Sequence, residues 1–333
     1  MSRVIRIATR KSPLALAQTR WVAERIRRRA PDVTVEEVHI VTKGDQIIDQ
    51  PLAKIGGKGL FISEVEATLV DGRADLAVHS MKDVPDELVE GFDILCVPER
   101  EDPSDVLVSV GGKELSELHQ GAIIGTSSLR RSCQLRAARP DLRFKVLRGN
   151  VGTRLRKLDE GLYDAIVLAY AGMLRLGLDQ ERELWALPED TSVPAVGQGA
   201  LGIEGKVDDA GLRDLLVDLE HPATRLAVEA ERAYLSRLQG SCTTPIAAFA
   251  RFDDDGETRM RIDGMVGSVD GETLLNASTD GYVDAPDHAA RLQQAARMGV
   301  ELAEMQLDRG AAELIQAAKS TEDPYLIGPY GPH

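Results

Sequence analysis

The segments Asp71–Met81, DGRADLAVHSM, and Glu160–Tyr170, EGLYDAIVLAY, share one pattern. In each, a helical stretch ends at a glycine (Gly72 or Gly161), an aspartate follows three residues later, and a short apolar run comes next. Glycine commonly ends a helix because it adopts the left-handed backbone conformation without steric cost. A short apolar run after such a turn is consistent with a buried strand. The repeat predicts two similar α/β lobes, with chance similarity of two helix–glycine–strand junctions as the alternative.

The first 220 or so residues alternate short apolar runs with helical periodicity, which is typical of α/β architecture. The expected strands are Val4–Ala8, Val35–Val41, Leu76–Val78, Ile94–Val97, Ala122–Gly125, Phe144–Leu147 and Ala165–Leu168. The expected helices are Leu14–Arg29, Ile62–Asp71, Leu129–Ala138 and Gly152–Gly161. Two segments, Arg100–Ser109 and Pro194–Glu204, are expected to carry the chain between the lobes and back.

After about His221 the pattern changes to a small α+β domain. Turn signals separate three strand-like runs, and helices flank them. The expected strands are Ile246–Phe252, Arg259–Val266 and Thr273–Ser278, and the expected helices are Ala223–Leu238, Pro286–Leu307 and Ala311–Lys319.

Composition excludes several classes of protein. A hydrophobic content of 43% in 333 residues is enough for packed cores. No apolar run approaches the roughly 18 residues of a membrane helix, and the N-terminus lacks a signal-peptide core, so we expect a cytoplasmic protein that binds no membrane. The three cysteines form no C-x-x-C pair and the six histidines show no metal-ligand spacing, so neither a disulfide framework nor a metal site is expected.

Positive charge is concentrated in one stretch of an otherwise acidic chain. The net charge is -14, yet Thr126–Arg156 contains eight Arg and one Lys against one Asp. Arginine offers planar, bidentate donors for carboxylates and phosphates. Nucleic acid is disfavoured as the ligand because aromatic residues make up only 4% of the chain and an acidic body repels a polyanion. The stretch therefore predicts a site for a small polycarboxylate or phosphate.

Three further motifs bear on chemistry. GQGALG at Gly197–Gly202 matches the dinucleotide-binding pattern, but no clear strand precedes it and no helix follows, so we reject that function. Cys242 lies in the loop GSCTTP, where a thiol can act covalently. HSMKDVP follows the strand ending at Val78, at the sheet edge where α/β proteins place ligands. Asp83 there is a candidate acid–base group, whereas His79 is expected to pack or hydrogen-bond.

These segments together resemble the hydroxymethylbilane synthase, or porphobilinogen deaminase, family. The motifs that carry the resemblance are IATRKSPLALAQ, TKGD, GGKGLF, RADLAVHSMKDVP, REDPSD, GTSSLRRSCQL, LRGNVGTRL, PAVGQGALGIE and the cysteine loop. They occur in the family's order over residues 5–318. The loop reads GSCTTP, where the family usually has a second glycine before the cysteine and Gln-Val or Ser-Val after it.

The resemblance implies a fold and an activity. The fold would be α/β, with two lobes like those of periplasmic binding proteins and a small C-terminal α+β domain with a three-stranded antiparallel sheet. The implied domains are residues 1–99 with 197–220, residues 103–195 and residues 222–320, followed by a tail at 321–333. The implied enzyme is a monomeric transferase that joins four porphobilinogen molecules head to tail on a dipyrromethane cofactor, releases ammonia, and hydrolyses the product to hydroxymethylbilane.

The resemblance also implies roles for individual residues. Cys242 would hold the dipyrromethane through a thioether, and Asp83 would be catalytic. Each pyrrole carries an acetate and a propionate, which suits an arginine-rich site. The implied cofactor- and substrate-binding residues are Arg10, Ser12, Gln18, Lys58, Ser80, Lys82, Thr126, Ser127, Ser128, Arg130, Arg131, Arg148, Arg154 and Gln198.

Two other functions are considered. A non-catalytic, two-lobed binding protein for a carboxylated metabolite is compatible with the fold, but Asp83 and Cys242 argue against a pure binder. A nucleic-acid-binding module is disfavoured by the acidic total charge.

Overall fold

The computed structural model describes residues 3–42, 62–241, 243–253 and 258–321. The chain forms two compact units. The first contains residues 1–101 and 199–225, and the second contains residues 102–198 and 226–333.

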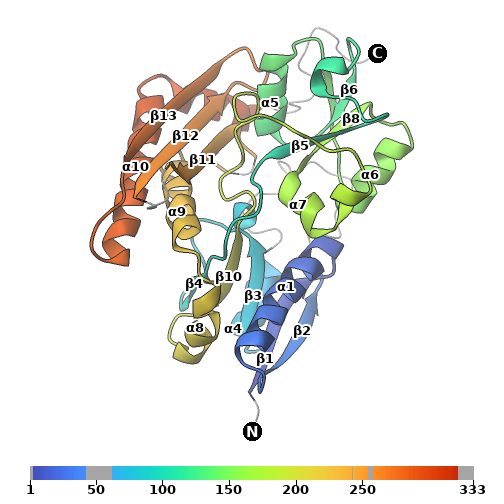
Figure 1. The fold of residues 1–333 in the computed structure, drawn as a ribbon. Helices are drawn as coiled ribbons and strands as arrows, with labels where there is room; N and C mark the ends of the chain where they lie inside the picture. Colours follow the sequence, from blue (N-terminus) through green and yellow to red (C-terminus); the bar gives the residue numbers. More distant parts are fainter. Residues whose placement is uncertain (1–2, 43–61, 242, 254–257, 322–333) are drawn as a thin grey trace. The chain divides into compact units, whose positions relative to one another are not determined.

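The first unit is built on a five-stranded mixed sheet with the order β2-β1-β3-β10-β4. Strand β1 pairs in parallel with β2 and β3, and β10 pairs antiparallel with β3 and β4. Figure 1 colours most of this unit blue to cyan and its returning segment olive. Its strands are β1 (Val4–Arg10), β2 (Thr34–Ile40), β3 (Leu76–Ser80), β4 (Phe92–Cys96) and β10 (Leu201–Lys206); its helices are α1 (Pro13–Arg29), α4 (Ser63–Val70) and α8 (Ala210–Leu216), with the short 3-10 helices η1 (Met81–Asp83) and η4 (Val217–Leu219).

Alternation along β1 gives this sheet two buried faces. Ile5 and Ile7 belong to one hydrophobic cluster with Val22 of α1, whereas Ala8 belongs to another with Val65 of α4. A sheet with parallel strands is typically covered on both faces, because its crossover helices lie there. Its carboxyl edge is then left for loops and ligand-binding residues.

The second unit begins with a sheet of the same design. Its order is β7-β6-β8-β5-β9, with β6 parallel to β7 and β8, and β5 antiparallel to β8 and β9. Its strands are β5 (Asp105–Ser109), β6 (Ile123–Gly125), β7 (Arg143–Lys145), β8 (Ala165–Ala169) and β9 (Trp185–Ala186); its helices are α5 (Leu129–Ala138), α6 (Val151–Asp159) and α7 (Tyr170–Arg175), with η2 (Leu115–Glu117) and η3 (Leu178–Gln180).

The repeat predicted from the sequence is confirmed in atomic detail. The glycines that follow α4 and α6 have φ angles of 67° and 74°. The side chain of Asp75 accepts a hydrogen bond from the backbone N–H of Arg6 at 2.7 Å, and that of Asp164 accepts one from Ile123 at 2.7 Å. Each aspartate thus ties the start of one strand to its parallel neighbour, at equivalent positions of the two sheets.

The two predicted connectors are only half right. Arg100–Ser109 and Pro194–Glu204 do carry the chain between the sheets, but their second halves form β5 and β10, each in the interior of its sheet. The rejection of dinucleotide binding is consistent with this, since GQGALG leads into a strand rather than a helix. Gly199 is required there: its φ is 87°, and an added Cβ would lie 2.3 Å from the carbonyl oxygen of Glu101.

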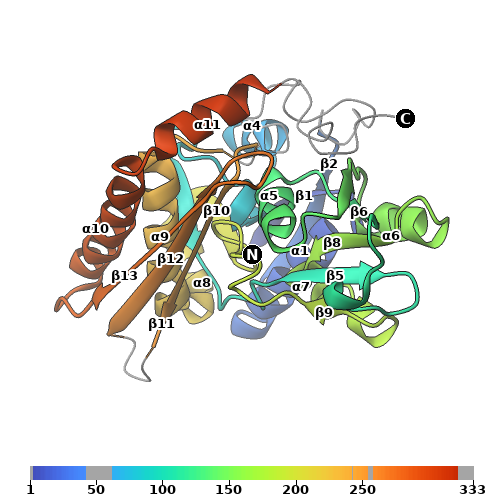
Figure 2. The same cartoon turned by 90° about the horizontal axis from the view of Figure 1, so that it is seen from above.

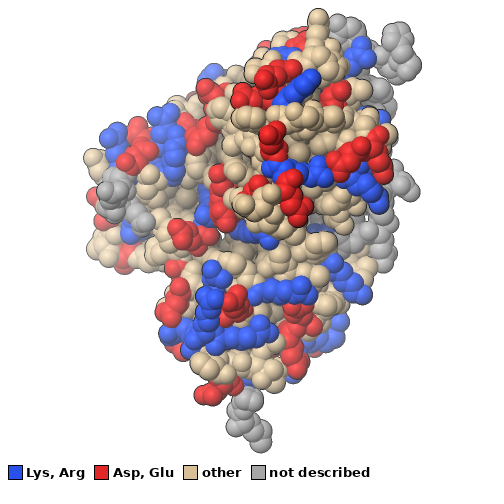
Figure 3. Space-filling view, turned by 45° about the vertical axis from the view of Figure 1, so that its right-hand side comes forward, with Lys and Arg blue, Asp and Glu red and all other residues tan. Residues whose placement is uncertain are grey.

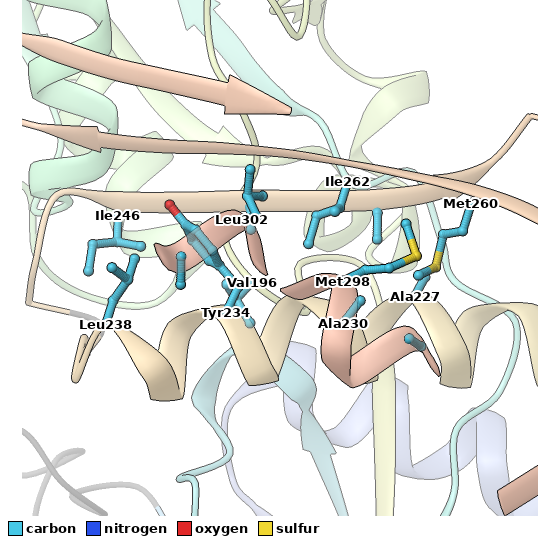
Figure 4. Close-up of a cluster of buried hydrophobic side chains, with 14 of the residues drawn as sticks. Val196, Ala227, Ala230, Tyr234, Leu238, Ile246, Met260, Ile262, Met298 and Leu302 are labelled. Carbon is cyan, nitrogen blue, oxygen red and sulfur yellow. The ribbon is translucent and has the colours of Figure 1, made fainter. Parts of the chain in front are cut away.

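The second unit also contains a three-stranded antiparallel sheet, β11-β12-β13, visible in orange in Figure 2. Its strands are β11 (Ile246–Phe252), β12 (Arg259–Gly267) and β13 (Leu274–Tyr282), and the helices are α9 (Pro222–Arg237), α10 (His288–Leu307) and α11 (Ala311–Ser320). Figure 4 shows Tyr234 and Ala230 of α9 lying beneath Ile262 of β12. An added Cβ at Gly299 would lie 2.0 Å from the Ala230 carbonyl, so the close packing of α10 on α9 requires glycine.

Acidic and basic side chains are interspersed over the face shown in Figure 3. Among the residues that the structure describes, no helix has the length and apolarity needed to cross a membrane. The predicted fold class, α/β with an additional three-stranded antiparallel sheet, is confirmed.

The aspartates of the repeat give a test of the fold. We expect Asp75→Ala and Asp164→Ala each to lower the free energy of unfolding by about 1–2 kcal/mol, because each leaves a strand N–H without its carboxylate acceptor. Urea unfolding followed by circular dichroism measures this. The control is Asp71→Ala, which removes an exposed carboxylate paired with the exposed Arg73 and should change stability little. Equal effects at all three positions would contradict the assigned role.

Candidate functional site

Predicted site residues of the first unit gather at the carboxyl ends of β1 and β3. Arg10 is the last residue of β1, and Ser80 is the last residue of β3. The turn η1 follows directly and carries Lys82 and Asp83. Because parallel strands end at the same edge of a sheet, this edge is where an α/β protein places ligands.

A small cavity of about 40 Å³ brings four of these predicted residues together. Arg10, Gln18, Ser80 and Asp83 line it. Gln18 is buried in α1 and donates a hydrogen bond to the Ser80 hydroxyl at 3.0 Å. This bond fixes the hydroxyl at the strand end, while Asp83 remains exposed at the cavity wall.

The remaining predictions in this unit have different outcomes. Ser12 is the N-cap of α1, and its hydroxyl accepts a hydrogen bond from the backbone N–H of Ala15 at 3.3 Å. Its predicted ligand contact therefore stays a prediction. Lys58 lies outside the described residues.

The predicted residues of the second unit occupy the matching edge of its sheet. Thr126, Ser127 and Ser128 connect β6 to α5. Ser128 caps α5 by accepting from the backbone N–H of Arg131 at 3.4 Å, and Ser127 donates to the carbonyl of Leu147 at 2.6 Å. A helix N-terminus presents unpaired N–H groups and a partial positive charge, which favour an anion.

Arg148 and Arg154 lie at the start of a second helix in the same unit. Asn150 caps α6 by accepting from the backbone N–H of Thr153 at 2.9 Å. Arg154 donates from Nε to the carbonyl of Gly149 at 2.8 Å, and both arginines are half-buried. The capped N-termini of α5 and α6 and these arginines thus all fall within the chain's most basic stretch, Thr126–Arg156.

Arg130 and Arg131 share one buried partner, Asp105. The Arg130 guanidinium bonds both carboxylate oxygens, at 2.6 and 3.0 Å. Arg131 bonds Oδ1 through Nε at 2.8 Å. The side chains of the two arginines are only 5% and 8% exposed, and that of Asp105 is fully buried. Their predicted contact with a carboxylated ligand stays a prediction.

Two neutral side chains complete this network around Asp105. Ser192 donates to Oδ2 at 2.7 Å, and Gln198 donates to Oδ1 at 2.9 Å and to the carbonyl of Pro103 at 2.7 Å. Gln198 is fully buried. The structure thus joins three predicted residues through a carboxylate that the sequence did not single out.

The arginines determine the ionisation of Asp105. Burial by itself would raise the pKa of this carboxyl group, but the charges of Arg130 and Arg131 outweigh it and hold the pKa well below its usual range. The contribution to stability is therefore complete above the unfolded-state pKa of about 4. It is lost as the pH falls from there toward the lower pKa of the folded state.

Two of the three cysteines are unsuited to covalent chemistry. Cys96 and Cys133 are buried, and burial raises the pKa of both thiols, that of Cys133 to about 12. Cys242 lies outside the described residues. Next to it, the Ser241 backbone N–H donates to the Thr244 hydroxyl at 2.9 Å, and that hydroxyl donates to the Ser241 carbonyl at 2.7 Å.

Among the described residues, no group of three or more His, Cys, Asp or Glu side chains could hold a metal ion. The sequence expectation did not include Glu204, whose carboxylate lies 2.8 Å from His79 Nε2. It did anticipate that His79 would pack or form a hydrogen bond at the strand end, and this is confirmed.

Comparison with known families decides the class of protein. A model described as "Porphobilinogen deaminase, dipyromethane cofactor binding domain" matches residues 5–214, and one described as "Porphobilinogen deaminase, C-terminal domain" matches residues 225–308. The chain belongs to the porphobilinogen deaminase family. It is a transferase of tetrapyrrole biosynthesis that condenses four porphobilinogen molecules on a dipyrromethane cofactor and releases hydroxymethylbilane.

Solved structures are also similar to parts of this chain, at low sequence identity. The VFT2 domain of Bordetella pertussis BvgS is 13% identical, with a TM-score of 0.40 over 64% of this chain and 84% of that one. A substrate-binding protein of an amino acid ABC transporter is 16% identical, with a TM-score of 0.36 over 65% and 91%. The alkanesulfonate-binding protein SsuA from Xanthomonas axonopodis pv. citri is 14% identical, with a TM-score of 0.36 over 71% and 75%.

The Asp105 network can be tested by its stability. We expect Asp105→Asn to lower the free energy of unfolding by about 3–5 kcal/mol at neutral pH, because two buried guanidinium groups lose their counter-charge. The variant should also lose less stability than the wild type on acidification below about pH 4. Asp141→Asn is the control, since Asp141 pairs with Arg139 near the surface. Parallel pH profiles for the wild type and Asp105→Asn would contradict the assignment.

Proposed function

We propose that Asp83 is the catalytic carboxylate of the condensation. Departure of ammonia from the substrate's aminomethyl group leaves a cation, and a carboxylate beside the pyrrole N–H stabilises such a charge. The observation that supports this role is the place of Asp83: it follows β3 directly and lines the same cavity as Arg10, Gln18 and Ser80. It is the only carboxylate among the described residues that line this cavity.

The residues of the second unit suit a carboxylated cofactor and a growing chain. Each added pyrrole brings an acetate and a propionate. We propose that Arg148 and Arg154, together with the capped N-terminus of α5 at Ser127 and Ser128, bind these groups; each charge-assisted bond contributes about 1.5–3 kcal/mol. Arg10, Ser12, Lys58 and Lys82 would add cationic and hydroxyl donors. When bound, the dipyrromethane supplies the primer to which new units are joined.

Arg130, Arg131 and Gln198 are proposed to act in the same region while anchored to Asp105. An arginine has five N–H donors in a fixed fork, and the bonds to Asp105 hold both forks in place. Thr126 supports this edge by accepting from the backbone N–H of Ser128 at 3.1 Å. The anchoring preorders the arginines before a ligand arrives, which lowers the entropy cost of binding.

Cys242 is proposed as the attachment point of the cofactor. Cys96 and Cys133 are disfavoured because their buried thiols ionise with difficulty, and the thiolate is the nucleophilic form. Ser241 and Thr244, which stand on either side of the family's cysteine position in the sequence, are joined to each other by two hydrogen bonds. In this chain, the hydrogen bonds of the Thr244 hydroxyl would set the geometry of the loop. Elsewhere in the family, the usual second glycine before the cysteine would have this role.

The remaining proposals concern organisation. We propose three domains, with residues 1–99 and 197–220 in the first, 103–195 in the second and 222–320 in the third, followed by the tail at 321–333. The separate hydrophobic clusters of the three sheets support this division. We further propose a monomer that works in the cytoplasm without metal, membrane or nucleic acid. A non-catalytic binding protein is disfavoured because both matched models describe the deaminase.

The role of Asp83 is tested by Asp83→Asn. The amide keeps the shape of the side chain but cannot carry negative charge, so we expect kcat to fall by roughly 10²–10⁴-fold while the protein stays folded. The measurement is steady-state release of ammonia from porphobilinogen, with circular dichroism as the folding control. Glu87→Gln, a matched change at an exposed acid four residues away, should leave kcat unchanged. Near-normal turnover by Asp83→Asn would contradict the proposal.

A further inference from the structure

A buried imidazole–carboxylate pair adjoins the Asp83 cavity, and its histidine, His79, is one of the residues that line the cavity. His79 Nε2 and Glu204 Oε2 are 2.8 Å apart, and the two side chains are 6% and 0% exposed. In the antiparallel register of β3 and β10, His79 stands opposite Gly202 and Glu204 stands opposite Ala77. The pair is therefore a diagonal neighbour pair on one face of the sheet.

The surroundings of Glu204 are unusual for a carboxylate. Its Oε1 atom is buried, and no hydrogen-bond partner for it is found among the described residues. The pairing of β10 with β4 slips by one residue between Ile203 and Glu204, and such irregularities often aim side chains beside active sites. Burial raises the pKa of Glu66 on α4, and the charge of Glu204 raises it further. Glu204 therefore acts electrostatically on its neighbours within this sheet face.

The two ring nitrogens of His79 differ in their hydrogen bonding. Nε2 is engaged with Glu204, whether the shared proton sits on nitrogen or on oxygen. No hydrogen bond of Nδ1 is found among the described residues. A carboxylate that holds one imidazole nitrogen fixes the tautomer and makes the other nitrogen the place where a proton is gained or lost. Nδ1 is therefore the ring nitrogen that the contact with Glu204 leaves unengaged.

His79 is also the only imidazole among the described residues that line the cavity. The other ionisable lining groups are Arg10, which stays charged, and Asp83. Behind the lining, Glu204 on β10 and Glu66 on α4 are the carboxylates that act on the imidazole. Among the described residues, Arg10, Asp83, Glu66 and Glu204 are thus the charged groups found around His79.

The condensation requires a proton to move. The C–N bond of the aminomethyl group breaks and its electron pair leaves with ammonia; the pyrrole α-carbon of the chain forms the new C–C bond and loses its proton. Ammonia departs before the α-carbon loses its proton, and it takes up that proton only afterwards, in solution, as ammonium. The reaction therefore consumes no net proton from the protein, but the proton released after C–C bond formation must be held until solvent or ammonia takes it up.

We propose that His79, held by Glu204, is the temporary store for this proton and acts through Asp83. His79 is a positioning residue in this role, because Asp83 rather than His79 meets the substrate. The inference rests on the proposed function of Asp83. It goes beyond that function by assigning the buried pair a place in proton transfer.

The first test needs no catalysis. In protein labelled with ¹⁵N-histidine, the His79 signals are identified by their absence in His79→Gln and followed between pH 5 and 9. We expect Nδ1 to gain and lose a proton while Nε2 stays hydrogen-bonded. Asp83→Asn should move the midpoint to lower pH, because a nearby negative charge favours imidazolium. Absence of titration, or an unchanged midpoint in Asp83→Asn, overturns the proposal.

The second test separates proton storage from a structural role. We expect His79→Gln to lower kcat by roughly 10²-fold and to remove from the pH profile the ionisation found at the NMR midpoint. Glu204→Gln should retain that ionisation with a lower midpoint. An equal loss of kcat at every pH in both variants would mean a structural role only and would overturn the proposal.

His39 provides a matched control. Its Nε2 atom lies 2.8 Å from Glu37 Oε2, the same distance as in the buried pair, but the His39 side chain is 43% exposed. His39→Gln should leave both kcat and its pH profile unchanged. The proposed role of Asp83 and the proposed role of His79 can fail separately. Full activity of Asp83→Asn would reject the role of Asp83. The NMR experiment on His79 is made without turnover and therefore tests the role of His79 by itself.

Discussion

One fully buried carboxylate, Asp105, organises the most basic part of the chain. It opens β5 and accepts hydrogen bonds from Arg130, Arg131, Ser192 and Gln198. These residues come from a helix and from the segment where the chain turns back, and the carboxylate ties both to the sheet. Burying an ion pair costs desolvation energy, so the network need not stabilise the protein more than apolar packing would. Its clearer effect is to hold these segments together, because moving one of them away would leave a buried charge without its partner.

The alternating pattern of apolar runs and helical periods was sufficient to predict most of the fold. The repeat of glycine and aspartate correctly indicated two similar sheets, down to matching hydrogen bonds of Asp75 and Asp164. The interior strands β5 and β10 were missed. β10 contains Gly202, Gly205 and a buried glutamate, none of which favours a strand by itself. Its conformation comes from antiparallel pairing with β3 and β4, which lie far from it in the sequence.

The candidate site, like the fold, could be predicted from the sequence only in part. Residues that end a strand or cap a helix, such as Ser80 and Ser128, could be placed from the sequence because local pattern determines them. Hydrogen-bonded pairs of residues that lie far apart in the sequence could not be predicted in this way. Asp105 meets Arg130 across 25 residues and His79 meets Glu204 across 125. Such contacts depend on sheet order and register, so the engagement of the arginines with Asp105 emerged only from the structure.

The account is tested most directly by the mass of the freshly purified protein, followed by peptide mapping. It predicts an excess equal to two condensed porphobilinogen units, carried by the peptide that contains Cys242. Protein isolated without the cofactor should acquire the same excess on incubation with porphobilinogen. A mass that stays unmodified after that incubation, or an adduct on the peptide of Cys96 or Cys133, would contradict the account.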